Sequence, residues 1–138
     1  MIIGQIQEGI VLDHITAGRG MEIYDILGLG KLDCTVAVIK NAESRKMGKK
    51  DIIKIGQVIE LDFTVLGYID PGITVNVIDG GKIVKREHLT LPKKISKVIR
   101  CTNPRCITST EQELVHEFYL ANPEKRVYRC VYCDAEKE

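Results

Sequence analysis

Apolar and polar positions alternate with the two-residue period of β-strands in five segments of the chain. Most of these segments are rich in Ile and Val, whose branched side chains favour strands. The last two segments are joined by Asp79-Gly80-Gly81, and the glycines suit the tight turn of a β-hairpin. The predicted strands are residues 6–15, 34–42, 49–55, 73–79 and 82–89.

Two segments between these strands have the spacing of an amphipathic helix instead. Residues 16–29 offer two alternative apolar stripes: Met21, Tyr24 and Leu27, or Ile23, Ile26 and Leu27. A shorter second helix is expected over residues 61–69. The order βαββαββ predicts an α+β, ferredoxin-like domain, in which an antiparallel sheet carries both helices on one face. The other face of the sheet would be free to bind a partner.

The pattern breaks in the stretch HLTLPKKISKV, where Leu91-Pro92 interrupts strand-like sequence and a basic run follows. A proline cannot continue a paired strand, so this stretch marks a boundary between domains. We expect a first domain at residues 1–91 and a second domain, small and all-β, at residues 92–138.

The second domain contains four cysteines in two closely spaced pairs. Cys101 and Cys106 enclose four residues, Cys130 and Cys133 enclose two, and 23 residues separate the pairs. Two thiolate pairs at this spacing can complete the tetrahedron of a closed, structural Zn²⁺ site. Binding of the metal would supply folding free energy on the order of 10 kcal/mol, so the domain should be largely unfolded without it.

Three other interpretations of the cysteines fit less well. Disulfides would leave Cys34 unpaired, and the sequence shows no export signal. A redox Cys-x-x-Cys motif needs a helix that begins at its first cysteine, but only eight residues follow Cys130 in this sequence. A catalytic zinc keeps one open coordination position, which four thiolates would close. Cys34 alternates with apolar residues and is expected to be a small buried side chain of a strand.

Several polar residues interrupt the strands of the first domain and are candidates for ligand binding. Lys50 and Lys54 lie four residues apart and would point to one side of a strand, where two ammonium groups suit phosphate oxygens. Lys85 and Arg86 could add a further cation if the strands lie close together. The alternative is that these side chains form a solvated edge that discourages aggregation.

Asp13-His14 places two polar groups inside the apolar strand IVLDHI, so one of them could hydrogen-bond a ligand. A lone histidine is also commonly a structural residue. The sequence contains no GxGxxG, GxxxxGK[ST] or GxSxG motif and no nucleophile at a recognisable spacing from a histidine. We therefore expect no catalytic site.

Composition and charge narrow the class of protein further. The 138 residues are 44% hydrophobic and 28% charged, with a net charge of +1. The main alternative is a zinc-ribbon protein that binds nucleic acid, but residues 101–138 carry five basic and seven acidic side chains, a balance that repels phosphates. No stretch approaches the roughly 18 apolar residues that span a bilayer, so we expect a soluble, cytoplasmic protein that binds neither nucleic acid nor membrane.

The segments IVLDHI, MGKKDIIKI and ITVNVID, the Leu91-Pro92 linker and the two cysteine pairs resemble, in this order, the regulatory chain of aspartate carbamoyltransferase. The resemblance covers nearly the whole chain. It implies a noncatalytic regulatory subunit of pyrimidine biosynthesis whose allosteric domain binds nucleotides, with CTP as inhibitor and ATP as activator. It also implies a zinc domain that docks on the catalytic chain, and a homodimer of regulatory chains.

The resemblance further implies which residues bind the nucleotide and the metal. The nucleotide positions are Ile6, Val11, Asp13, His14, Lys50, Lys54, Asn76, Ile78, Lys85 and Arg86. Ile6 and Val11 would line the base pocket, Asp13 and His14 would lie near the base or ribose, and the two lysines of the third strand near the ribose or phosphates. The family's phosphate-binding lysine falls on Lys85 or Arg86, because the local spacing allows either. The zinc ligands would be Cys101, Cys106, Cys130 and Cys133.

Overall fold

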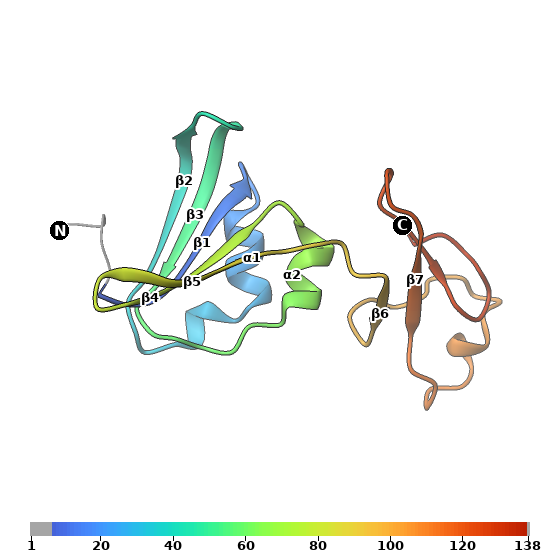
Figure 1. The fold of residues 1–138 in the computed structure, drawn as a ribbon. Coiled ribbons are helices and arrows are strands. Elements are labelled where there is room, and N and C mark those ends of the chain that lie inside the picture. The colour runs from blue at the N-terminus through green and yellow to red at the C-terminus, as the bar shows by residue number, and fades with distance from the viewer. Residues whose placement is uncertain (1–6, 138) are drawn as a thin grey trace. The chain divides into compact units, whose positions relative to one another are not determined.

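The structure is a computed structural model that describes residues 7–137. The chain divides into two compact units, Met1–Thr90 and Leu91–Glu138, and each unit has its own antiparallel sheet (Figure 1). We call them the N-terminal unit and the C-terminal unit. Within the described residues, no helix combines the length and the apolar character that are needed to cross a membrane.

The N-terminal unit is a five-stranded sheet in the order β2-β3-β1-β4-β5, with every neighbouring pair antiparallel. Two helices, α1 (Gly20–Ile26) and α2 (Phe63–Ile69), cover the same face of this sheet (Figure 1). The predicted α+β fold with both helices on one face is therefore confirmed. The strands are β1 (Glu8–Thr16), β2 (Val36–Ser44), β3 (Gly48–Ile55), β4 (Thr74–Asp79) and β5 (Lys82–His88).

The core of the N-terminal unit lies between the sheet and the helices. Leu12 of β1 is fully buried and stands opposite Ile53 of β3 and Val75 of β4. Because side chains alternate between the two faces of a strand, these residues share the helix-covered face. Ile23 of α1 and Leu66 of α2 are also fully buried and complete the same cluster.

The first helix is shorter than the sequence predicts. Strand β1 continues to Thr16, and a turn in which the N–H of Arg19 donates to the Thr16 carbonyl delays the helix until Gly20. Gly28 then adopts a left-handed conformation with φ 65°, which a glycine accepts without steric cost, and a short 3₁₀ helix, Leu29–Lys31, follows. In the second helix, the Asp62 side chain accepts hydrogen bonds from two backbone N–H groups of the first turn and fixes where α2 begins.

The predicted stripes of the first helix are also corrected in part. Ile23 is fully buried, whereas Met21 and Ile26 are 44% and 49% exposed. Tyr24 and the C-cap residue Leu27 are partly buried against the same core. The side of the helix that packs on the sheet therefore combines residues of both predicted stripes.

The C-terminal unit is a three-stranded antiparallel sheet in the order β6-β7-β8, with a short 3₁₀ helix. Its core is small, and its fully buried aromatic, Phe118, stands opposite Cys130 of β8. So small a core supplies little burial energy, and a domain of this size usually needs a metal or disulfides to fold. The strands are β6 (Lys94–Ser96), β7 (Glu117–Asn122) and β8 (Val127–Cys130).

We predict that Leu12→Ala destabilises the N-terminal unit by about 2–5 kcal/mol, because it leaves a cavity at the centre of the core. Urea denaturation followed through the amide NMR signals of β1 and β4 measures the change. Val84→Ala is the control: Val84 is 61% exposed, so its truncation should change the free energy of unfolding by less than about 0.5 kcal/mol. Equal unfolding midpoints for the two variants would contradict this account of the core.

Candidate functional sites

The four cysteines of the C-terminal unit converge on one point. Their sulfur atoms all lie within 4.8 Å of one another. The Sγ atoms of Cys101 and Cys133 are 3.6 Å apart, and those of Cys106 and Cys130 are 3.7 Å apart, so each close contact joins one cysteine of each pair. Tetrahedral coordination with Zn–S bonds of about 2.3 Å separates neighbouring sulfurs by about 3.8 Å. The spacing fits four ligands of one metal ion and is far too long for disulfide bonds.

Local backbone turns bring the sulfurs of each pair to the same side. The N–H of Cys106 donates to the Asn103 carbonyl, which closes the first loop. In the second loop, the N–H of Asp134 donates to the Cys130 carbonyl, and Asp134 adopts a left-handed φ of 64°. Both turns form within a few residues, so each cysteine pair is arranged locally.

Neighbouring side chains hold the cysteines in place. The Thr108 hydroxyl donates to the Cys106 sulfur at 3.1 Å, and Nδ1 of His116 accepts the N–H of Cys101 at 3.0 Å. Contacts of this kind orient the ligands of a metal and tune their basicity.

The four thiols differ in how easily they lose a proton. Burial raises the pKa of Cys101 to about 12, and the neighbouring thiols add to this effect. Burial also acts to raise the pKa of Cys133, but hydrogen bonds from the Ala135 N–H and the Asn103 side chain outweigh it and lower the pKa to about 7. One sulfur is therefore easily ionised, whereas a set of four thiolates needs the positive charge of a metal.

In the N-terminal unit, four of the ligand positions indicated by the sequence form one row across the sheet. Val11 of β1 stands opposite Lys54 of β3 on one side and Asn76 of β4 on the other, and Asn76 stands opposite Arg86 of β5. Residues directly opposite each other share a face, and Val11 alternates with the core residue Leu12. The row therefore lies on the face that the helices do not cover. Nε of Arg86 donates to Oδ1 of Asn76 at 2.9 Å.

Three further positions gather beside this row. Nζ of Lys50 lies 2.9 Å from Oδ1 of Asp13. Burial raises the pKa of Asp13, but the hydrogen bonds from Lys50 and from the His14 N–H outweigh it, so the pKa of this carboxyl is lower than usual and Asp13 is ionised at neutral pH. His14 has a positive φ of 59°, and its Nδ1 lies 3.2 Å from Oγ1 of Thr74.

The structure separates Lys85 from Arg86. Lys85 stands opposite Val77, which pairs with the core residue Ile10, so Lys85 belongs to the helix-covered face, and its ammonium pairs with Glu87 at 2.7 Å. Arg86 alone of the two joins the row. The register shift between Val77 and Ile78 decides this placement.

Two predicted ligand positions remain, Ile78 and Ile6, and the structure adds a residue that the sequence did not indicate. Ile78 is 8% exposed and stands opposite Gly9 and Ile83, two residues beyond Asn76 on the same strand. Ile6 lies outside the described residues. Thr74, the partner of His14, was not indicated by the sequence, because its proximity depends on the pairing of β1 with β4.

A sheet unit with a polar, helix-free face, followed by a unit built around a cysteine cluster that can hold a metal, defines a two-domain protein with a candidate ligand face in one unit and a candidate metal site in the other. Family models match both parts: residues 1–90 match the allosteric domain of the aspartate carbamoyltransferase regulatory chain, and residues 93–138 match its metal-binding domain. The chain belongs to this family of regulatory chains, which are noncatalytic subunits.

Similar proteins span the same length. The aspartate carbamoyltransferase regulatory chain of Clostridium botulinum (strain Hall) is 54% identical over 134 residues, which are 97% of this chain and 92% of the relative. That of Clostridium tetani is 53% identical over 135 residues, 97% and 94% of the two chains. The regulatory chain of Bifidobacterium longum is 41% identical over 136 residues, 99% and 98% of the two chains.

We predict that removing the metal with a thiol-reactive mercurial unfolds the C-terminal unit and leaves the N-terminal unit folded, because only the former depends on the four sulfurs. Amide NMR spectra before and after treatment report the two units separately. Cys130→Ser should abolish binding of one metal ion per chain, measured by elemental analysis, whereas Cys34→Ser should not. A C-terminal unit that keeps its spectrum without metal would refute the prediction.

Proposed function

We propose that this chain is a regulatory subunit that binds nucleotide effectors on the helix-free face of its N-terminal unit and joins the catalytic chain of aspartate carbamoyltransferase through a zinc-bound C-terminal unit. The expected setting is pyrimidine biosynthesis in the cytoplasm, with CTP as inhibitor, ATP as activator and the regulatory chains paired as homodimers. The observation that carries the nucleotide site is the row of Lys54, Val11, Asn76 and Arg86 beside the Asp13–Lys50 pair.

The chemistry of this face suits a nucleoside triphosphate. Lys50, Lys54 and Arg86 supply three cations, which favour phosphate oxygens. The row crosses four strands, a width of about 14 Å at strand spacings of about 4.8 Å, so its two ends can hold different parts of one nucleotide. Asp13 and Asn76 offer oxygens that can accept hydrogen bonds from an amino group or a ribose hydroxyl.

The position of the lysines also argues against a purely protective role. Charged residues protect a sheet against aggregation when they lie on an edge strand. The edges of this sheet are β2 and β5, whereas β3, which carries Lys50 and Lys54, pairs with β2 and β1. A solvated edge therefore does not explain these two lysines, and their position supports a ligand-binding role.

Assembly with the catalytic chain is supported by apolar side chains beside the cysteines. Val131 and Tyr132, which lie between Cys130 and Cys133, are 39% and 45% exposed, and Ile107, which follows Cys106, is 52% exposed. Exposed apolar residues grouped around one site are typical of protein interfaces. Zn²⁺ is the metal that best fits four thiolates in a closed structural site. The metal would act by holding these side chains in a shape that the catalytic chain can bind.

Regulation follows from linkage between nucleotide binding and the state of the assembled enzyme. A nucleotide that binds one quaternary state more tightly shifts the equilibrium toward that state, typically by about 1–3 kcal/mol of coupling free energy. CTP would favour the state of lower activity. The chain itself would carry out no chemical step.

We predict that regulatory chains treated with a mercurial fail to assemble with catalytic trimers, because the docking surface loses its shape when the metal leaves. Size-exclusion chromatography of mixed chains measures assembly, and added Zn²⁺ with excess thiol should restore it. Trimers alone should keep their carbamoyl transfer activity. Complete assembly of metal-free chains would sink the docking role of the metal.

We predict that Lys54→Ala and Arg86→Ala each weaken CTP binding about tenfold or more, since each removes a charged hydrogen-bond donor from the row. Isothermal titration calorimetry of the full chain measures the affinity. Lys85→Ala is the matched control. Lys85 is a cation on β5 like Arg86, but it belongs to the helix-covered face, so the variant should bind CTP with wild-type affinity. If Lys85→Ala weakens binding and Arg86→Ala does not, the proposed row is wrong.

A further inference from the structure

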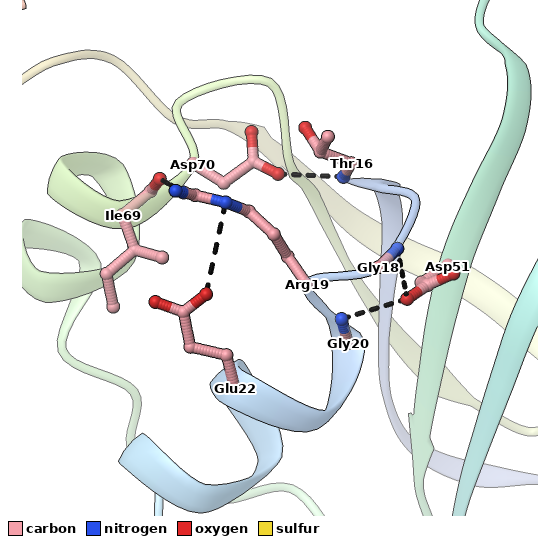
Figure 2. Close-up of polar contacts among 8 residues, drawn as sticks. All are labelled: Thr16, Gly18, Arg19, Gly20, Glu22, Asp51, Ile69 and Asp70. Carbon is pink, nitrogen blue, oxygen red and sulfur yellow. Dashed lines mark hydrogen bonds and ion pairs between the residues drawn. The ribbon is translucent and has the colours of Figure 1, made fainter.

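Asp51 is a fully buried carboxylate of β3 that the proposed site does not use. It follows Lys50 directly, and because adjacent strand residues point to opposite faces, it lies on the helix-covered face with Ile15, which stands opposite it in β1. Its Oδ2 accepts the N–H groups of Gly18 at 3.1 Å and Gly20 at 2.9 Å (Figure 2). Its Oδ1 accepts the N–H of Asn41 at 3.0 Å. One carboxylate of β3 thus joins β2, the turn after β1 and the start of α1.

These hydrogen bonds reach two irregular parts of the backbone beside Lys50. The bond to Asn41 lies within a bulge of β2, and the bonds to Gly18 and Gly20 hold the turn that follows a bulge of β1. The pairing of β1 with β3 shifts register between Leu12 and Ile15, and this bulge contains Asp13 and His14. The pairing of β2 with β3 shifts register between Ile39 and Ala42, and the bulge contains Asn41, which has a positive φ of 57°. Bulges of this kind redirect side chains, and they need contacts that hold them.

The segment that follows the β1 bulge is anchored from two sides. Asp51 binds Gly18 and Gly20, and Oδ2 of Asp70 accepts the N–H of Thr16 at 2.8 Å (Figure 2). The backbone at Gly20 lies so close to Asp51 that a side chain would not fit: a Cβ there would be 2.8 Å from Oδ2 of Asp51. The carboxylate and the loop are therefore fitted to each other.

We propose that Asp51 is a positioning residue of the nucleotide site. Its carboxylate, on the helix-covered face, fixes the backbone of β3 and its neighbours that directs Lys50, and through it the paired Asp13, toward the ligand on the opposite face. A buried carboxylate that accepts three N–H groups is held in one place, because hydrogen bonds to a charged group are strong. The inference rests on the proposed function of that face.

The test is a double-mutant cycle on CTP affinity, measured by titration calorimetry of the full chain. In Asp51→Asn, the amide keeps one acceptor oxygen, but its NH2 group faces N–H donors that the other carboxylate oxygen accepted. Either Asn41 in the β2 bulge or the Gly18–Gly20 turn therefore loses its anchor. We expect affinity to fall about tenfold. In a Lys50→Ala background, where the side chain to be directed is missing, the same change should cost less than about twofold.

Two further variants separate positioning from general loss of stability. Gly20→Ala keeps the carboxylate of Asp51 but displaces it, so it should weaken CTP binding in the same direction. If Asp51→Asn does not fold, Gly20→Ala takes its place as the test of whether Asp51 positions the site. Asp62→Ala removes a cap whose hydrogen bonds stay within α2, so it should destabilise the unit by a comparable route and leave the affinity unchanged.

The outcomes distinguish the inference from the function on which it rests. A wild-type chain that does not bind CTP, ATP or any other nucleoside triphosphate overturns both. If the wild type binds and Lys50→Ala weakens binding, but Asp51→Asn or, in its place, Gly20→Ala binds as the wild type does, the inference alone fails. It fails too if Asp51→Asn lowers the affinity by the same factor with and without Lys50, because such independence means that Asp51 does not act through it.

Discussion

The pairing of the central strand β1 with both β3 and β4 is the constraint on which the N-terminal unit depends. This pairing sets Leu12 against Ile53 and Val75 on one face and Val11 against Lys54 and Asn76 on the other. Because neighbouring residues of a strand point to opposite faces, one register builds the core and the candidate ligand face together. A shift of one residue would bury the lysine and expose the core.

The C-terminal unit is stabilised in a different way. Its sheet has three short strands and buries few large side chains, so burial of apolar surface alone contributes little to its stability. The four sulfurs take the place of a larger core, since a metal bound by all of them crosslinks both ends of the unit. Side chains between and beside the cysteines remain exposed, so the cluster that stabilises the unit also shapes its surface.

The two faces of the N-terminal sheet are connected through β3. Lys50 and Asp51 are consecutive, yet one pairs with Asp13 on the helix-free face and the other binds the start of α1. A nucleotide that moves Lys50 would therefore act on the backbone that Asp51 holds, and on the helix behind it. For a nucleotide bound as proposed, this arrangement would provide a contiguous route of paired strands and hydrogen bonds to the helix layer.

Much of the architecture was predictable from the sequence. The order of strands and helices follows from local periodicity, and the metal cluster from the spacing within each cysteine pair, because both are decided by residues close together in the chain. The early start assigned to the first helix was wrong, since Thr16 is paired in β1 and a turn precedes Gly20. Periodicity alone cannot locate such an end.

Other features were decided only by the tertiary structure. The choice between Lys85 and Arg86 depends on a register shift in the β4–β5 pairing, and the contact of His14 with Thr74 on the pairing of β1 with β4. The proposed role of Asp51 depends on a bulge of β2 and a helix start that meet at its carboxylate. The sequence determines such contacts only through the complete sheet, because hydrogen bonds between distant strands, and not local preferences, set which side chains become neighbours.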